Sequence, residues 1–462
     1  MRAKLIIFFS LIALVSNGQL NSLSPYSLFG IGDLYRTGSV ATHGLGGVSS
    51  TWNDPYILNP ENPSTLGSLF NTNFQTGLRL QSLRITEGDQ SQTLNAGNID
   101  QFNFAFKKAK SNTGYLFGLS PFSTSGYSIT KQEEIDGVGN AAFKYDGSGG
   151  ISKIYLGAGH KVDMYKYHYF NDKSGNVYDS LRVVQRSISF GGKVNYVFGN
   201  IKNIRAIDIA DVTFVDTRST KTTRIYDFLF DLGVHYEQDL RTRYGSDKRL
   251  NSRTFIQLGA VYTPKMKMQI ELNELVESTV TSSGVVLPVD SSSNVTSTGS
   301  FMMPQNLKFG VALHHHNKNG RQFALAVDVN QRNWSELNNS DVQLVGQLKD
   351  TREYSFGFQF TPKPIEDAKN MFSRSNYRLG ARLTPTYVTV QDEQITEQAI
   401  SAGLTIPLLS SRSASKIHFG MEIGSRGKNE GNMIREDFTN FYIGFSLSPF
   451  YKNAWFVQRK YE

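Results

Sequence analysis

Cysteine is absent from the 462 residues of this chain. Its absence excludes a disulfide framework, a catalytic thiol and a bacterial lipid anchor on a leading cysteine. Beyond residue 18 the chain also lacks any run of eighteen uncharged apolar residues, so no transmembrane helix is predicted in the mature protein. It has neither a Gly-x-Ser-x-Gly nucleophile elbow nor a phosphate-binding Gly-Lys-Ser/Thr loop. We therefore expect neither an enzyme nor a cofactor.

Charged residues make up only 19% of the chain, and basic residues exceed acidic ones by eight. The Lys and Arg residues are scattered without a block, so the positive net charge does not indicate nucleic-acid binding. It is typical of solvated loops and of attraction to anionic lipid headgroups. Aromatic residues are plentiful at 12%, mainly Phe and Tyr, which suits a band of side chains facing lipid.

The first eighteen residues have the pattern of a secretory signal peptide. Arg2 and Lys4 flank the start of an apolar run that continues to Val15, and small residues follow it. The run is too short to cross a bilayer as a helix. We expect cleavage near Gly18–Gln19 and export of the mature chain.

Two-residue alternation of apolar side chains is the strongest pattern in the mature chain. Successive side chains on a strand point to opposite faces, so each alternating stretch has one apolar face and one mixed face. Six stretches alternate strictly: Phe228/Phe230/Leu232/Val234, Leu307/Phe309/Val311/Leu313, Phe323/Leu325/Val327/Val329, Tyr354/Phe356/Phe358/Phe360, Ile417/Phe419/Met421/Ile423 and Phe441/Ile443/Phe445/Leu447. A seventh alternates loosely: Ile188/Phe190/Val194/Tyr196/Phe198. A soluble β-sandwich would show the same alternation, but export of the chain favours an outer-membrane barrel.

The alternation predicts an all-β fold, a transmembrane antiparallel β-barrel of about 14 strands with an N-terminal hatch plugging the lumen. Strands are predicted near 69–87, 99–109, 113–129, 151–162, 187–199, 223–238, 253–280, 301–315, 321–333, 352–361, 376–391, 395–408, 415–425 and 435–448. Long outer loops are predicted at 130–150, 200–222, 281–300 and 334–351, with the Ser/Val/Thr-rich stretch 277–300 mobile. Periplasmic turns are predicted as short at 110–112 and 316–320, and as unusually long at 163–186, 239–252 and 362–375.

Four parts are expected along the chain: a signal peptide at 1–18, a hatch at 19–68, the barrel at 69–449 and a periplasmic tail at 450–462. The hatch is broken by three turn-forming pairs, Asp54-Pro55, Asn59-Pro60 and Asn62-Pro63. Irregular backbone persists at membrane depth only where protein encloses it, so we place this segment inside the barrel.

Several short motifs carry a resemblance to a known family. Leu45-Gly46-Gly47-Val48 and Asn59-Pro60 are similar to the Gly-Gly and Asn-Pro-Ala signature in the hatch of the FadL family of long-chain fatty acid transporters, in its Bacteroidetes branch. Glu61 departs from that signature, which usually has Ala. Residues 24–33, 147–151 and 455–460 supply further matches. The resemblance implies a 14-stranded plugged barrel that passes hydrophobic molecules, and a relation to PorV, a component of type IX secretion.

Pro121 and Phe122 lie inside the third predicted strand. Proline cannot donate to a strand ladder, so a strand interior tolerates it only at a bulge, an edge or a break. One interpretation is a gap in the wall through which an apolar ligand leaves sideways, because FadL-like transporters are kinked in the corresponding strand. The other is a bulge near the rim.

Other chemically suggestive residues favour structural interpretations. His314 and His316 share a strand face, but two imidazoles make a poor zinc site, so no metal is expected. The acidic pairs Glu133/Glu134 and Glu366/Asp367 fall in predicted connections and suit solvation. Tyr167 and Tyr169 belong to an insertion that suits either a protein interface or a hairpin extending two strands.

Two functions fit these observations. The first is outer-membrane transport of small hydrophobic compounds through a plugged barrel. The second is a non-transporting barrel subunit of an outer-membrane secretion or assembly machine, favoured by the long periplasmic connections and by Trp455 and Phe456 in the tail, which need an apolar contact. The expected partners are outer-membrane lipid, a hydrophobic small molecule and other outer-membrane or periplasmic proteins. We expect Val327→Arg to be costly and Asp328→Arg, on the lumen face, to be tolerated.

Overall fold

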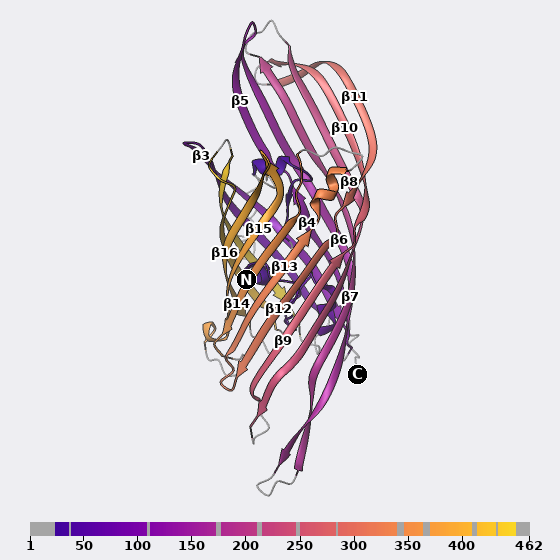
Figure 1. The fold of residues 1–462 in the computed structure, drawn as a ribbon, viewed down its shortest axis with the longest axis vertical. Coiled ribbons are helices and arrows are strands. Elements are labelled where there is room, and N and C mark those ends of the chain that lie inside the picture. The colour runs from indigo at the N-terminus through magenta and orange to yellow at the C-terminus, as the bar shows by residue number, and fades with distance from the viewer. Residues whose placement is uncertain are drawn as a thin grey trace, which may run out of the picture.

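The computed structural model describes residues 24–449 except 37, 109–110, 172–176, 210–214, 246–249, 283–284, 340–345, 364–369, 409–413 and 431–432. Fourteen antiparallel strands form a closed ring (Figure 1). They are β2 (Asn73–Glu87), β3 (Gln90–Lys107), β4 (Thr113–Thr124), β6 (Gly139–Asn171), β7 (Val177–Ile209), β8 (Asp216–Tyr244), β9 (Leu250–Thr263), β12 (Asn306–Asn317), β13 (Gln322–Arg332), β14 (Thr351–Thr361), β15 (Asn376–Val390), β16 (Glu393–Pro407), β17 (Lys416–Arg426) and β18 (Arg435–Leu447). Pairing of β18 with β2 closes the ring, so the predicted 14-stranded barrel is confirmed. The expected signal peptide and the tail at 450–462 lie outside the described residues.

The apolar rows predicted from the alternation face outward. On β13, Leu325 and Val327 are 46% and 48% exposed, whereas Ala326 and Asp328 are 1% and 3% exposed. Phe228 to Val234 on β8 and Phe419 to Ile423 on β17 follow the same pattern. Such rows form the lipid-facing band of an outer-membrane barrel.

An even number of strands brings the chain into and out of the ring at the same rim. That rim also carries the connections after β3, β6, β8 and β12, so we take it as periplasmic. Among the described residues, no helix is both long and apolar enough to cross a bilayer.

The outer rim continues into a six-stranded sheet that stands clear of the barrel (Figure 1). This outer sheet combines the outer parts of β6, β7 and β8 with three strands that do not belong to the ring: β5 (Tyr127–Ile135), β10 (Met266–Ser282) and β11 (Val285–Met303). β5 pairs with β6, β10 pairs with β8, and β11 pairs with β10.

The outer sheet corrects several expectations. The stretches predicted as loops at 130–150, 200–222 and 281–300 are mainly strands where the structure describes them, so a mobile loop at 277–300 is wrong. The strand predicted at 253–280 is two strands that break at Pro264-Lys265, and the one predicted at 113–129 breaks at Ser125-Gly126. These strands meet no lipid, so their sequences carry no apolar row to reveal them.

At the periplasmic rim, β6 and β7 continue as a two-stranded ribbon, the lowest part of the molecule in Figure 1. The two strands stay paired as far as Asn171 opposite Val177. β4 pairs with β6 only to His160, and β8 pairs with β7 only to Arg186. The insertion predicted at 163–186 is therefore a hairpin that extends two strands.

The hatch fills the lumen with short elements: η1 (Pro25–Leu28), β1 (Asp33–Leu34), α2 (Val40–His43) and η2 (Pro63–Ser68). Ser39 and Thr42 form a capping box that satisfies the amino terminus of α2. Leu45, Val48 and Trp52 pack on small lumen-facing alanines of β12 and β13. Leu58 and Leu66 pack on β3, β4 and β6. The core of the molecule is thus the boundary between hatch and wall.

Candidate functional site in the barrel lumen

The hatch lies against the wall because the wall carries glycine where they meet. A Cβ atom on Gly357 would lie 2.9 Å from the Leu45 carbonyl oxygen, and one on Gly444 would lie 2.7 Å from Val40 Cγ2. Neither distance is compatible with a side chain at the glycine. Eleven glycines from eleven strands meet the hatch in this way, and we call them the glycine belt: Gly77, Gly114, Gly159, Gly191, Gly233, Gly259, Gly310, Gly357, Gly380, Gly403 and Gly444.

Gly46 and Gly47, singled out in the sequence, are the matching part of the hatch. Gly46 has φ +68° and Gly47 φ +90°, backbone conformations that side chains rarely permit. A Cβ atom on Gly46 would also lie 2.6 Å from the Ala381 carbonyl oxygen and 2.8 Å from that of Phe356. The Gly-Gly pair therefore lets the hatch turn while touching β14 and β15.

Asn59 and Pro60 hold two limbs of the hatch together. The Asn59 side-chain amide donates to the carbonyl oxygens of Ser49 (2.6 Å) and Trp52 (2.9 Å). The Pro60 carbonyl accepts a hydrogen bond of 2.8 Å from Lys193 Nζ on β7. The Asn-Pro turn is thus both an internal tie of the hatch and a contact with the wall.

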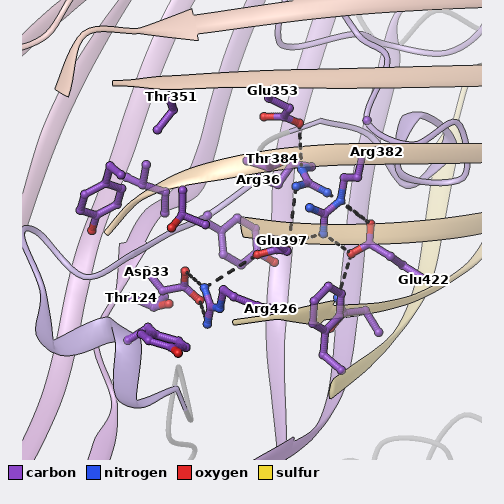
Figure 2. Close-up of a pocket in the computed structure, with 18 of the residues that line it drawn as sticks. Asp33, Arg36, Thr124, Thr351, Glu353, Arg382, Thr384, Glu397, Glu422 and Arg426 are labelled. Carbon is purple, nitrogen blue, oxygen red and sulfur yellow. Dashed lines mark hydrogen bonds and ion pairs between the residues drawn. The ribbon is translucent and has the colours of Figure 1, made fainter. Parts of the chain in front are cut away.

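Arg36 of the hatch reaches three glutamates on three strands (Figure 2). Its guanidinium lies 3.5 Å from Glu353 on β14, 3.9 Å from Glu397 on β16 and 3.3 Å from Glu422 on β17. Arg382 on β15 pairs with two of the same glutamates, at 2.9 Å from Glu422 and in closer contact with Glu397.

Arg426 on β17 holds the start of the hatch. It lies 2.8 Å from Asp33 of β1 and 2.6 Å from Glu436 of β18, and it donates to the Ser24 hydroxyl at 2.6 Å. Ser24 in turn donates to Glu436 at 2.6 Å. We call the three arginines and their carboxylates the arginine clamp: Arg36, Arg382, Arg426, Asp33, Glu353, Glu397, Glu422 and Glu436.

Asp328 and Asp100 make further buried contacts with the hatch. One carboxylate oxygen of Asp328 accepts from the backbone N–H groups of Ser49 and Ser50, both at 2.7 Å. Asp100 accepts from the Tyr35 hydroxyl at 3.0 Å and lies 3.3 Å from His43 Nε2. Charged hydrogen bonds of this kind are the strong ones, because one partner is ionised.

The arginine clamp, except for Glu436, lines a cavity of about 150 Å³ between the hatch and the wall (Figure 2). Arg79, Lys308 and Glu61 add further charges to the lining. Glu61, the departure from the FadL-like signature, lies 3.5 Å from Lys308 and also lines a second cavity of about 70 Å³. Charged walls hold water and do not favour an apolar ligand, because burying them against it would leave charges unsolvated.

Pro121 lies where the wall loses a strand pairing. β3 and β4 pair only from Lys107 opposite Gly114 to Phe102 opposite Leu119. Beyond Leu119, towards the outer rim, β4 keeps its pairing with β6 on the other edge but no longer pairs with β3. The β4–β6 register also shifts between Pro121 and Ser123. Both features expected from a strand proline, a bulge and a break, therefore coincide.

The hatch covers this break. Residues Asp33 and Leu34 of β1 pair with Thr124 and Ser123 of β4, and the Tyr35 N–H donates to the Phe122 carbonyl at 2.9 Å. Passage of a ligand at Pro121 and Phe122 stays a prediction.

The other predicted residues lie away from the lumen cavity. Tyr167 and Tyr169 are on the periplasmic ribbon, 53% and 60% exposed, and Trp455 and Phe456 lie outside the described residues. His314 is buried and stacks on Phe255 with ring centroids 4.7 Å apart. The part of the chain that the structure describes contains no group of three His, Cys, Asp or Glu able to hold a metal ion.

Sequence reasoning missed the arginine clamp and the glycine belt. The belt had a signal: Gly233, Gly310, Gly357 and Gly444 recur at lumen-facing positions of the alternating strands. The clamp had a weaker one, the glutamate and arginine residues at lumen positions of β15 to β17. Neither signal identifies the hatch residues that these wall positions contact.

The family model described as BamG matches residues 1–165 and 177–462. Among solved structures, the chain is similar to the toluene transporter TodX of P. putida, with 14% identity, a TM-score of 0.52, and 90% of this chain and 99% of that chain covered. It is also similar to the Ralstonia pickettii toluene transporter TbuX, with 13% identity, a TM-score of 0.51, and 90% and 99% covered. No curated protein matches.

The two structural similarities concern the fold, because identity is low. They confirm the barrel fold, and a closed ring of 14 antiparallel strands with an apolar outer band is a protein of the bacterial outer membrane. The relation to the Bacteroidetes branch of the FadL family and to PorV stays a prediction. The BamG match omits only residues 166–176, at the end of the periplasmic ribbon. The chain belongs to the BamG family.

Proposed function

We propose that this protein is a non-transporting barrel subunit of an outer-membrane machine for protein secretion or assembly. The observation that carries the proposal is the amount of ordered structure outside the membrane. The outer sheet adds β5, β10 and β11 to long extensions of β6 to β8. β5, β10 and β11 do not belong to the ring that surrounds the lumen. A sheet of this size offers both faces and a free edge to other proteins.

The attachment of the hatch supports the same proposal. Displacing the hatch would leave Glu353 without its arginine partner, whereas Glu397 and Glu422 keep Arg382. A carboxylate left without its partner in the wall is costly. It would also open empty space along the glycine belt, where the wall has no side chains to fill it. A hatch attached in this way suits a permanent closure better than a gate.

Membership of the BamG family adds a third support. The match includes the residues of β5, β10 and β11, so the family model extends over the segments that form the outer sheet.

Extraction of outer membranes in a mild detergent tests the proposal. The native mass of the particle that contains this chain is measured, and its components are identified and counted. We expect the barrel to co-purify with other proteins in fixed ratio. A barrel that elutes alone from membranes extracted without harsh detergent overturns the proposal.

Passage of small hydrophobic molecules is the second candidate function. The break between β3 and β4 beside Pro121 supports it, as does the likeness in fold to two toluene transporters. If molecules pass there, Pro121→Val restores a backbone donor in β4 and narrows the opening. Uptake of a hydrophobic probe such as toluene into cells would fall while the barrel still folds. Unchanged uptake contradicts transport at this break.

A further inference from the structure

One face of the periplasmic ribbon consists of tyrosine side chains that are exposed to solvent. Tyr165, Tyr167 and Tyr169 alternate along β6, so their side chains share one face of the ribbon. They are 48%, 53% and 60% exposed. Tyr167 and Tyr169 stack with ring centroids 6.5 Å apart.

The opposite face of the ribbon is packed, which fixes the tyrosine face in place. Phe170 is only 7% exposed and lies edge-on to His168, with centroids 5.0 Å apart. Both rings also contact Tyr244 at the end of β8, at 6.2 Å and 4.9 Å respectively. The ribbon is therefore held by the neighbouring hairpin on one side only.

Arg182 supplies a charge at the centre of the tyrosine face. It lies opposite Tyr167 in the β6–β7 ladder, and its guanidinium sits 3.8 Å from the centre of the Tyr165 ring. Stacking of this kind orders a guanidinium while leaving its N–H groups at the edge free to donate. Arg182 forms no ion pair with any residue that the structure describes.

The surroundings of this face are also basic. Arg186, Arg241 and Arg243, on this ribbon and the neighbouring hairpin, have no carboxylate partner among the described residues. Asp179 on β7 accepts from the Ser180 N–H. Asp163 is engaged by Lys161 at 3.1 Å. Tyrosine and arginine are the residue types most enriched at the energetic centre of protein interfaces, and the charge here favours a negative partner.

We propose that the tyrosine face, formed by Tyr165, Tyr167, Tyr169 and Arg182, binds an acidic segment of a periplasmic partner protein. A carboxylate of the partner accepts from the Arg182 guanidinium, and the partner's backbone and apolar groups cover the three rings. A two-stranded ribbon is marginally stable alone in water, so a partner lying across it also stabilises the ribbon. Tyr167 and Tyr169 lie outside the BamG match, whereas Tyr165 and Arg182 lie inside it. The inference rests on the proposed function as a subunit and names the chemistry of one partner.

The absence of cysteine permits a direct test. Tyr167→Cys in the full-length chain gives one thiol. Outer-membrane vesicles that carry this variant are opened to expose their periplasmic side, the thiol is labelled with a thiol-reactive benzophenone, and the sample is irradiated. Leu240→Cys, 57% exposed on the neighbouring hairpin, is the matched control. We expect an adduct between the Tyr167→Cys chain and another protein, with the cross-linked peptide rich in Asp and Glu, and none from the Leu240→Cys chain.

Charge reversal decides the role of Arg182. Adding Arg182→Glu to the Tyr167→Cys chain should lower the yield of the adduct about tenfold, while Arg182→Lys should retain most of it. Equal adducts at both cysteine positions, an adduct insensitive to Arg182→Glu, or cross-links to lipid or to this chain alone overturn the inference. If extraction still yields a fixed complex but position 167 gives no adduct, the tyrosine face is wrong and the subunit function stands.

Discussion

Asp328 shows what periodicity reveals about a residue and what it omits. The alternation of β13 places Asp328 on the lumen face, and it is 3% exposed there. Its carboxylate accepts from two backbone N–H groups of the hatch, at Ser49 and Ser50. An arginine would direct a cation at those donors, so the structure reverses the expectation that Asp328→Arg is tolerated. A strand sequence gives the face of a side chain but not the group packed against it.

Val327, one residue earlier, tests the lipid-facing assignment. Val327→Arg places a charge in the apolar band and should cost about 2–4 kcal/mol near the bilayer midplane. Gln331→Arg, on the same face of β13 but near the outer rim, should cost about 0–1 kcal/mol. Folding titrations read by the shift of heat-modifiable bands compare the two variants. Equal cost at both positions would contradict the depth and register assigned to β13.

Arg36 tests how firmly the hatch is held. Arg36→Ala leaves Glu353 without an arginine, while Glu397 and Glu422 keep Arg382. It should destabilise the seated hatch by about 3–5 kcal/mol, the usual cost of breaking a buried pair. Arg224→Ala on β8 removes an exposed pair, 3.6 Å from Glu271, and should change stability by at most about 1 kcal/mol. Ion conductance of single barrels in planar bilayers measures the result: we expect openings for Arg36→Ala only. A silent Arg36→Ala barrel would mean that the glycine belt alone keeps the hatch seated.

At the scale of elements, prediction succeeded wherever lipid imposed a pattern. The strands from β12 to β18 were placed within a few residues, because their outward rows must be apolar. In the outer sheet, β10 falls mostly inside the predicted strand 253–280, whereas β11 and most of β5 fall in predicted loops. Water on both faces of these strands imposes no period of two on their sequences. β11, with Ser291, Ser292 and Ser293 in succession, resembles a loop in composition, and it forms a strand there by pairing with β10.

The hatch could be located from sequence for a related reason. Turn-forming pairs exclude a long strand or helix, and irregular backbone inside a membrane has to be enclosed. Its contacts could not be located, since pairs such as Arg36 and Glu422 are separated by nearly the whole chain. Nothing local in sequence links such distant residues.

The glycine belt makes a prediction about wall strands. Gly380→Ala on β15 places a Cβ against the backbone of Gly46 and should cost about 1–3 kcal/mol by overpacking. Gly192→Ala on β7 meets only Leu232, 3.9 Å away, and should be neutral. Limited proteolysis of the hatch in folded barrels distinguishes them: Gly380→Ala should expose hatch sites and Gly192→Ala should not. Equal protection of the hatch from proteolysis in both variants would show that β15 can shift to accommodate the added Cβ atom.

At the scale of the whole molecule, the barrel ring closes without the strands β10 and β11 of the outer sheet. β9 and β12 pair directly, with Thr263 opposite Asn306, although the entire β10–β11 hairpin lies between them in the chain. The barrel wall is therefore complete without that hairpin. The arginine clamp and the glycine belt also belong to ring strands and to the hatch, although Met268 of β10 and Phe301 of β11 share a buried apolar cluster with Ile31 of the hatch.

Deletion of residues 266–303 should therefore leave a folded barrel. Pro264, Lys265, Pro304 and Gln305 remain as a four-residue turn between the paired strands, a length common in β-hairpins. We expect normal heat modifiability, a closed hatch and insertion in the outer membrane, with loss of the proteins that dock on the outer sheet. Native mass after mild extraction measures that loss, and Tyr167→Cys cross-linking in the same variant reports whether the periplasmic contact survives alone. A deleted barrel that keeps every partner would move docking away from the outer sheet. One that fails to fold would mean that β8 needs β10 beside it before the ring can close.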